Sequence, residues 1–249
     1  MLLDHRMRSA GGALFRWRSY VLLSFLPLIA LAVTKAEPVE QMIGGFWGEA
    51  FELGCILLVL GGLVVRAATA GFVPARTSGR NTRDQVADRL NTEGLYALTR
   101  NPLYLGNCMI YLGVVLFTQD LMLSLAFALF LLVYYERIIL AEEAFLLDRF
   151  GETYRTWSDD VPAFFPRLSG WRKPSLPFSL RTVIRREYPG WFAAILALGL
   201  IAIGQDLFVG DRAWHLDRGW LIAIGLSAAA YGIVHFLKLR TRVLRVPGR

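Results

Sequence analysis

Two polar blocks in the middle of the chain carry residue types from which a binding site could be built. The first ends in Asn101 and Pro102, a pair that favours a helix start, and the backbone N–H groups of such a start can bind anions, carboxylates included. The second contains Glu142 and Glu143, which could accept hydrogen bonds from a cation or from ribose hydroxyls. A zwitterionic cofactor that carries a nucleoside would fit both poles. Ordinary capping and a solvated helix face explain the same residues, so residue types alone leave both interpretations open.

The elements between the two blocks decide whether the blocks can meet. Residues 102–117 and 121–140 are apolar runs, separated by a tight turn at residues 118–120. So short a turn makes the runs antiparallel neighbours, and both polar blocks then emerge on the same side of a membrane. We expect the second run to continue as a helix to Phe150 and to stop at Gly151. The sequence therefore predicts a site assembled at a membrane surface.

The composition indicates a membrane protein. Of the 249 residues, 55% are hydrophobic and 19% are charged, with a mean hydropathy of +0.44, whereas soluble domains are about 45–50% apolar and about 25% charged. The long apolar runs predict an all-α, polytopic transmembrane helix bundle. About six spans are expected, at residues 20–33, 46–68, 102–117, 121–140, 188–209 and 220–237. The first run is short for a crossing, and Ala30-Leu31-Ala32 also fits the cleavage site of a signal peptide.

The distribution of basic residues sets the expected orientation. The chain has a net charge of +7, and its Lys and Arg residues gather in the N-terminal segment, the two long polar connections and the C-terminal tail. Such segments stay on the cytoplasmic side of a membrane. Both termini and both polar blocks are therefore predicted to face the cytosol, from an inner, plasma or internal membrane. The short loops on the other side hold few basic residues.

Two classes of partner are not favoured. The basic residues flank apolar spans, which explains their charge without a nucleic-acid partner. Cys55 and Cys108 lie inside apolar runs, and His5, His215 and His235 are scattered along the chain. None of these residues has the spacing of a metal site, so no metal is expected.

Glycines in the second and third runs predict close helix packing. Gly54, Gly61 and Gly62 lie in the second run, and Gly106 and Gly113 in the third. Small residues let helix backbones approach each other inside a membrane. We expect these glycines to mark helix–helix contacts.

The order of motifs around the hairpin resembles that of a known family. YALTRNPLYLGN, the apolar hairpin, R-x4-EE-x2-L-x3-FG-x2-Y and VPAFFP follow one another within residues 80–166. This combination resembles the isoprenylcysteine carboxyl methyltransferase and phospholipid methyltransferase superfamily of integral membrane enzymes. The resemblance implies S-adenosylmethionine as cofactor, in a pocket facing the cytosol, and a hydrophobic substrate that enters from the membrane lipids. It divides the chain into N-terminal transmembrane helices (1–79), a methyltransferase core (80–170) and a C-terminal helix pair with a basic tail (171–249).

The resemblance also assigns candidate site residues. Glu142 matches the glutamate that contacts the cofactor, and Arg137 is the nearest match to the arginine that faces the substrate. The cofactor-binding candidates are Asn81, Leu90, Asn91, Tyr96, Arg100, Asn101, Pro102, Leu103, Tyr104 and Glu142, and the catalytic candidates are Arg137, Glu142 and Glu143. Two positions depart from the family pattern. Asn101 replaces a histidine, and Arg137 lies one residue further from the glutamates than in the prenylcysteine enzymes.

The resulting hypothesis is a membrane methyltransferase that acts on a lipidic or small hydrophobic acceptor. A carboxylate or thiolate acceptor needs little base catalysis, whereas an amine or hydroxyl needs a proton acceptor, for which Glu142 and Glu143 are the candidates. The two departures keep acceptors other than a prenylcysteine open. Phospholipid N-methylation, thiol S-methylation and an inactive helix bundle are the alternatives.

Overall fold

The computed structural model describes residues 3–18, 20–35, 38–74, 77, 87–208 and 218–249. Within these residues the chain is almost entirely helical and has no strand, which confirms the all-α class. The elements are α1 (Leu3–Trp17), the 3₁₀ turn η1 (Val21–Phe25), α2 (Leu26–Val33), α3 (Pro38–Ile43), α4 (Gly45–Phe72), η2 (Leu95–Ala97), α5 (Pro102–Leu116), α6 (Leu121–Phe150), α7 (Glu152–Asp160), η3 (Leu168–Gly170), α8 (Leu180–Phe208) and α9 (Arg218–Arg240).

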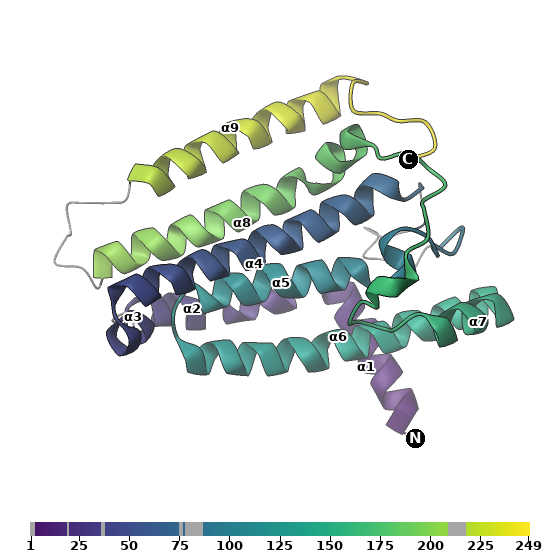
Figure 1. The fold of residues 1–249 in the computed structure, drawn as a ribbon, viewed down its shortest axis with the longest axis horizontal. Helices are drawn as coiled ribbons and strands as arrows, with labels where there is room; N and C mark the ends of the chain where they lie inside the picture. The colour runs from purple at the N-terminus through teal and green to yellow at the C-terminus, as the bar shows by residue number, and fades with distance from the viewer. Residues whose placement is uncertain (1–2, 19, 36–37, 75–76, 78–86, 209–217) are drawn as a thin grey trace.

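The long helices form a layered bundle. In Figure 1, α9, α8, α4, α5 and α6 follow one another from top to bottom, and each packs against the next. The most extensive interface joins α4 to α5, and α1 packs against α6. The α7 helix extends beyond α6 at the end of the bundle where the C-terminus also lies. One end of the bundle therefore collects the polar segments.

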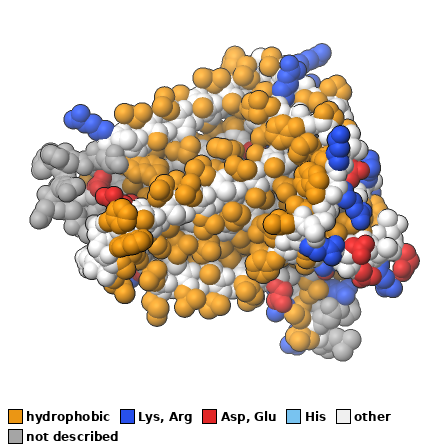
Figure 2. Space-filling view, viewed as in Figure 1, with side chains coloured by type: hydrophobic (Ala, Val, Ile, Leu, Met, Phe, Trp, Pro, Cys, Tyr) orange, Lys and Arg blue, Asp and Glu red, His pale blue; other side chains and the backbone are white. Residues whose placement is uncertain are grey.

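Four helices, α4, α6, α8 and α9, are long and apolar enough to cross a membrane. Figure 2 shows hydrophobic side chains over the middle of the molecule and charged side chains gathered at one end. The 15-residue α5 is only about 22 Å long at about 1.5 Å per residue, short of a hydrocarbon core of about 30 Å. The first apolar run forms η1 and α2, which make an angle of 83° with α1. Four of the six predicted spans are thus long enough, while crossings by the first run and by α5 stay predictions.

Glycine packing brings α4 and α5 into backbone contact. A Cβ atom on Gly62 would lie 2.5 Å from the Gly106 carbonyl oxygen, and one on Gly113 would lie 2.9 Å from the Cys55 carbonyl oxygen. The prediction of close packing is confirmed at these three glycines. Gly54 differs, because no atom lies within 4 Å of an added Cβ.

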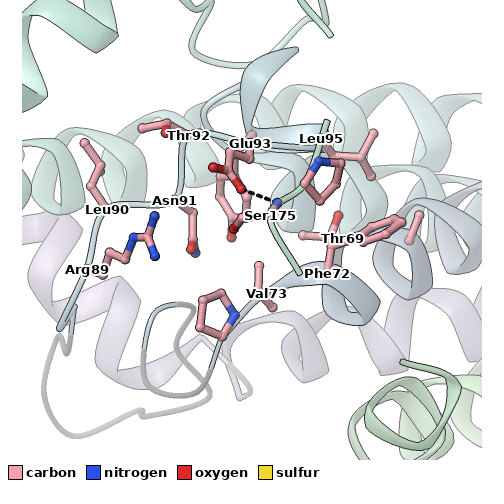
Figure 3. Close-up of a pocket in the computed structure, with 14 residues that line it drawn as sticks. Thr69, Phe72, Val73, Arg89, Leu90, Asn91, Thr92, Glu93, Leu95 and Ser175 are labelled. Atoms are coloured by element: carbon pink, nitrogen blue, oxygen red, sulfur yellow. Dashed lines mark hydrogen bonds between the residues drawn. The ribbon is translucent and has the colours of Figure 1, made fainter. Parts of the chain in front are cut away.

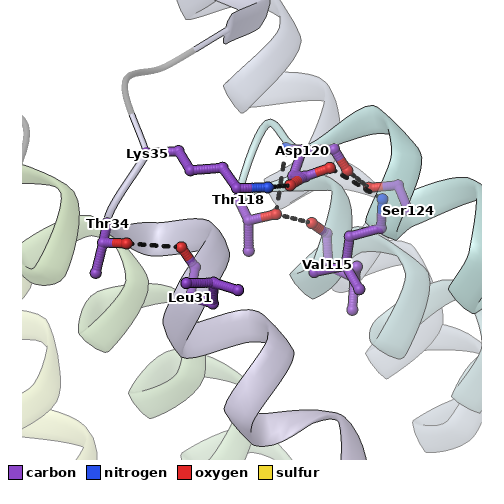
Figure 4. Close-up of polar contacts among 8 residues, drawn as sticks. Leu31, Thr34, Lys35, Val115, Thr118, Asp120 and Ser124 are labelled. Atoms are coloured by element: carbon purple, nitrogen blue, oxygen red, sulfur yellow. Dashed lines mark hydrogen bonds and ion pairs between the residues drawn. The ribbon is translucent and has the colours of Figure 1, made fainter.

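A compact turn joins α5 to α6, as the sequence predicts. Gln119 adopts a positive φ of 60°, and the Asp120 carboxylate caps α6 by accepting a hydrogen bond from the Leu123 N–H at 3.0 Å. Lys35 reaches the same carboxylate at 2.6 Å, which ties the end of the first apolar run to the hairpin (Figure 4). The Leu123 N–H and the Lys35 ammonium hold the pKa of Asp120 below its usual value.

Two helix boundaries differ from the predicted ones. The fifth span was expected from Tyr188, but α8 begins at Leu180 and runs through Pro189. Ser179 provides the reason: its hydroxyl accepts a hydrogen bond from the Thr182 N–H at 3.3 Å and so caps the helix. At the other end of the hairpin, α6 runs to Phe150 and stops at Gly151, whose φ is 55°, as predicted.

Candidate functional site

A cavity of about 990 Å³ opens between α1, η1, α2, α4, α5, α6 and α8. Its polar lining includes Arg18, Arg66, Tyr96, Arg100, Asn101, Tyr104, Asn107, Glu142, Arg186 and Glu187, and its apolar lining includes Leu22, Leu26, Ile29, Ile110, Val114, Phe127, Ala193 and Ala197. On α5 and on α8 the polar lining residues precede the apolar ones, and on the antiparallel α6 they follow them. The cavity therefore has a polar end and an apolar end, as a pocket for an amphiphile needs.

An ion pair joins the two polar blocks at the polar end. The Arg100 Nη1 atom lies 2.9 Å from Glu143 Oε1, which connects the residues before α5 to the far end of α6. Tyr154 of α7 also interacts with Arg100. Burial, together with the nearby Glu143 carboxylate, raises the pKa of Tyr154 to about 12. Arg100 lines the cavity, while Glu143 and Tyr154 hold it there.

The second contact between the blocks joins the Tyr104 hydroxyl to the Glu142 carboxylate. Both side chains line the cavity. Arg18, which follows α1, also interacts with the Tyr104 hydroxyl, and the Tyr135 ring lies 5.0 Å from the Tyr104 ring. The cavity-lining carboxylate of the second block therefore lies against residues from α5 and from the turn after α1.

Residues 162–164, from the VPAFFP motif, fix the start of α5. Backbone carbonyls of this segment accept hydrogen bonds from the Arg100 N–H (2.9 Å, Pro162), from the Asn101 side chain (2.9 Å, Ala163) and from the Thr99 hydroxyl (2.9 Å, Phe164). The motif thus acts through its backbone. It locks the residues that lead into the helix.

Asn101 occupies the predicted N-cap position and Pro102 the first turn, but the Asn101 side chain makes no capping hydrogen bond. The Asn101 amide donates to Ala163 and makes no cap, and the Asn101 carbonyl oxygen already accepts from the Tyr104 and Leu105 N–H groups. Pro102 has no N–H. Among the described residues, the Leu103 N–H is the first-turn donor without a backbone partner. The helix start offers a ligand fewer N–H groups than the sequence predicts.

Three further cofactor candidates line a smaller pocket of about 30 Å³ beside the cavity (Figure 3). These are Leu90, Asn91 and Tyr96, and Tyr96 also lines the large cavity, as does Leu103. The Asn91 amide donates to the Thr77 carbonyl oxygen at 3.1 Å, and the Asn91 side chain also interacts with Tyr96. Asn81 lies outside the described residues.

A connection from the C-terminal half of the chain pins this loop. The Ser175 N–H donates to Glu93 Oε2 at 2.6 Å, and the Gly94 N–H donates to the Arg172 carbonyl oxygen at 2.9 Å. Hydrogen bonds from Ser175 hold the pKa of Glu93 below its usual value. Residues that precede α8 therefore help to shape the pocket.

Arg137 is placed apart from the other candidates. It does not line the cavity in the part of the chain that the structure describes, and its guanidinium lies 3.6 Å from Glu136. Its backbone carbonyl faces α1, where a Cβ on Gly11 would clash with that oxygen. Helical geometry explains this, because Ile138 and Glu142 share the cavity face and Arg137 is rotated from Ile138 by about 100°.

A second polar cluster was missed in the sequence. Arg66 Nε donates to Glu187 Oε2 at 2.8 Å, and Arg66 Nη1 donates to Asn107 Oδ1 at 2.5 Å. The cluster joins α4, α5 and α8, and all three residues line the cavity. A signal was available, because Arg66 and Asn107 interrupt apolar runs and polar residues inside membrane helices mark functional sites by default.

Comparison with known proteins places this geometry in a family. Residues 50–153, from α4 into α7, match the phospholipid methyltransferase family. The chain is 37% identical to the cobalt-zinc-cadmium resistance protein CzcN of Cupriavidus metallidurans over 157 residues, which cover 61% of this chain and 68% of that protein. The chain belongs to the isoprenylcysteine carboxyl methyltransferase and phospholipid methyltransferase superfamily. With its apolar helices, membership of this superfamily makes it an integral membrane protein.

Two further relatives show how the similarity is distributed. The nickel-cobalt-cadmium resistance protein NccN of Alcaligenes xylosoxydans is 32% identical over 131 residues, covering 52% of this chain and 58% of NccN. The protein-S-isoprenylcysteine O-methyltransferase of Schizosaccharomyces pombe is 34% identical over 79 residues, covering 32% of this chain and 34% of the enzyme. No solved structure matches the chain. Since the family match ends at residue 153, α8 and α9 lie outside it.

Proposed function

We propose that this protein is an S-adenosylmethionine-dependent methyltransferase of a hydrophobic, membrane-soluble acceptor. Membership of a family of membrane methyltransferases supports this activity. The observation that carries the proposal is the contact between the two polar blocks, where Arg100 pairs with Glu143 and Tyr104 lies against Glu142. These contacts lie at the polar end of a cavity whose other end is apolar.

The residues at the polar end fit the cofactor chemically. S-adenosylmethionine carries a carboxylate, an ammonium group, ribose hydroxyls and a sulfonium. Arg100 supplies a cation, and its Nε is buried without an acceptor among the described residues, which leaves a donor for the carboxylate. Glu142 offers acceptor oxygens for the ammonium or a ribose hydroxyl, and Tyr96 links this end to the loop with Leu90 and Asn91. The cavity lies at the upper end of the range of about 300–1,000 Å³ for ligand pockets.

Methyl transfer of this kind needs little acid–base catalysis from the protein. S-adenosylmethionine would supply, when bound, a methyl group activated by its positively charged sulfur. The chain must align the acceptor and exclude water, and the apolar lining from η1, α2, α5 and α8 provides such a surface. For an amine or hydroxyl acceptor, Glu142 is the carboxylate in the cavity that could take the proton.

The acceptor is proposed to reach the cavity from the bilayer. Leu23 and Leu26 line the cavity and are 52% and 54% exposed. Lining side chains with so much exposed area favour an opening of the cavity beside η1 and α2. Lipids or other hydrophobic molecules could pass there without entering water. Lys and Arg residues gather at this end of the bundle, and the positive-inside rule therefore favours a cytosolic location for it.

The family offers more than one acceptor class. The relative from fission yeast is named for a prenylcysteine carboxylate, and the matching family for phospholipids. Arg137 does not line the cavity and Asn101 bonds to the backbone, so neither residue gives a prenylcysteine an advantage. We propose a lipidic or small hydrophobic acceptor, held by residues other than Arg137.

Transfer of labelled methyl groups tests the activity. Membranes that contain the protein should be incubated with methyl-labelled S-adenosylmethionine, and the lipid and volatile fractions analysed for label. Label in a lipid or a volatile thiol, present with the wild type and absent with Glu142→Gln at equal expression, is the expected result. Equal labelling with and without the protein would favour an inactive helix bundle.

A further inference from the structure

The segment that follows α9, residues 241–249, returns to the end of α4. Figure 1 shows the C-terminus beside the connection that precedes α8 and close to the place where α4 ends. Leu244 is 6% exposed, so an apolar side chain anchors the returning segment to the rest of the protein. This segment and the connection lie outside the family match, whereas the end of α4 lies inside it. A part of the chain outside the match therefore reaches a wall of the matched region.

Arg249 joins the end of α4 to that connection. Its Nη1 atom donates to the Gly71 carbonyl oxygen at 2.7 Å, and its Nη2 atom donates to the Pro177 carbonyl oxygen. The Gly71 carbonyl also accepts from the Ser179 N–H at 2.9 Å. Carbonyls in the last turn of a helix have no partner within the helix, and a guanidinium can donate from two nitrogen atoms at once. Arg249 therefore clamps two backbone segments through their carbonyl groups.

The two clamped carbonyls flank the smaller pocket. Residues 72–74, directly after Gly71, line this pocket, and so do residues 174–175, shortly before Pro177. The Phe178 ring packs so closely on α4 that a Cβ on Gly71 would clash with it. The distance between these two lining segments is thus set by the contacts at Gly71 and Pro177.

The same connection holds the loop that carries cofactor candidates. The Ser175 N–H donates to Glu93 Oε2 at 2.6 Å, and the Gly94 N–H donates to the Arg172 carbonyl oxygen at 2.9 Å. Tyr96 follows two residues later and lines both the pocket and the cavity. A shift of the connection would break both hydrogen bonds, and the loop would lose the contacts that fix Tyr96.

We propose that Arg249 is a positioning residue for the cofactor end of the cavity, and that it acts through the connection before α8 and the loop with Glu93 and Tyr96. The inference rests on the proposed function, because it takes S-adenosylmethionine to be the ligand. Among the described side chains, that of Arg249 lines neither the pocket nor the cavity. Its effect on binding comes from holding the loop in one conformation. When that conformation is only partly populated, the apparent affinity falls by the populated fraction.

Amide hydrogen exchange tests the position of the loop without any ligand. The full-length protein is purified in a neutral maltoside detergent and compared with Arg249→Gln. The variant should exchange the Gly94 and Ser175 N–H groups about tenfold faster, because both hydrogen bonds depend on the clamped connection. The Arg100 N–H instead bonds to the carbonyl oxygen of Pro162 and should exchange at the wild-type rate.

Calorimetric titration of S-adenosylhomocysteine into the same preparations tests the effect on the ligand. Arg249→Gln should raise the Kd roughly three- to tenfold. Arg245→Gln removes an exposed cation from the same segment and, as the matched control, should change neither the Kd nor the exchange rates.

A double variant tests the route. Glu93→Gln weakens the contact of the loop with Ser175 and should also raise the Kd. Because both residues act through one connection, Glu93→Gln combined with Arg249→Gln should lose less binding free energy than the sum of the two single losses.

A merely structural role for Arg249 would give a different pattern. Faster exchange at Arg100 and throughout α8 and α9, or unchanged exchange at Gly94 and Ser175, would overturn the proposal. Wild-type affinity in Arg249→Gln, or additive losses in the double variant, would overturn it as well.

The two measurements also separate this inference from the proposed function. A loop that does not respond to Arg249→Gln, in a protein that binds S-adenosylhomocysteine, refutes the positioning role alone. A loop that responds as expected, in a wild type that binds no S-adenosylhomocysteine, refutes the methyltransferase and with it the cofactor as the ligand that Arg249 affects.

Discussion

Arg100 and Glu143 form an ion pair of 2.9 Å between the start of α5 and the cytosol-directed end predicted for α6. The hairpin between them folds back at residues 118–120, so two residues that are separated by 42 others in the sequence lie next to each other. Tyr104 and Glu142 meet beside the ion pair. The two contacts turn a pair of sequence motifs into one end of a cavity.

Removal of the Tyr104 hydroxyl should weaken cofactor binding. Tyr104→Phe keeps the ring that packs on Tyr135 but loses the hydroxyl that lies against Glu142, so the KM for S-adenosylmethionine should rise about tenfold. Tyr188→Phe removes a hydroxyl that contacts His235 of α9, away from the cavity lining, and serves as the matched control. Steady-state kinetics with both variants checks the prediction, and equal KM values would contradict it.

Glu143 should act as a positioning residue. Glu143→Gln leaves a side chain of the same size but removes the negative charge that pairs with Arg100. The KM for the cofactor should therefore rise roughly three- to tenfold, and kcat should change less. Glu152→Gln alters an exposed glutamate on α7 that pairs with Arg155 and should have no effect. A fall in kcat at constant KM for Glu143→Gln would assign Glu143 a direct part in the chemistry.

The contact between α4 and α5 should depend on Gly62. Gly62→Ala would force a methyl group to within 2.5 Å of the Gly106 carbonyl oxygen, and such overpacking costs about 1–3 kcal/mol. Gly54→Ala adds the same methyl group to the same helix, where no atom lies within 4 Å, and should not lower the melting temperature. Thermal unfolding in detergent compares the two variants, and equal melting temperatures would refute the close packing.

The Asp120 cap should make stability depend on pH. The pKa of Asp120 is depressed in the folded protein, so its contribution is present above the unfolded value of about 4 and is lost as the pH falls through the folded value. Asp120→Asn should therefore lower the melting temperature at pH 7, and its difference from the wild type should shrink below about pH 4. A difference that stays constant down to pH 3 would show that the carboxylate charge plays no part.

Local patterns predicted the hairpin well. The turn at residues 118–120 and the glycine at 151 carry their own conformational signals, so the meeting of Arg100 with Glu143 follows from chain length and turn geometry alone. The glycine contacts at Gly62 and Gly106 likewise follow from residue size. These features depend on neighbours close in the sequence or on one pair of adjacent helices.

The features that the sequence did not predict depend on contacts between residues far apart in the chain. Arg66 and Glu187 are 121 residues apart, and the expected start of α8 at Tyr188 placed Glu187 in a surface connection. The hydroxyl of Ser179, a helix-capping signal, would have moved that boundary. Asn101 has the residue type of a cap, but the Ala163 carbonyl offers its amide a partner, and this tertiary bond outweighs the local preference.

Calorimetric titration of S-adenosylhomocysteine into the purified protein tests the central claim most directly. Wild type should bind with a measurable heat, and Glu142→Gln should bind at least roughly tenfold more weakly, because it loses a charged acceptor in the cavity, while Lys35→Met binds as the wild type does. Binding by Glu142→Gln that equals the wild type, or no binding by the wild type, would contradict the assignment of the polar end of the cavity as the cofactor site.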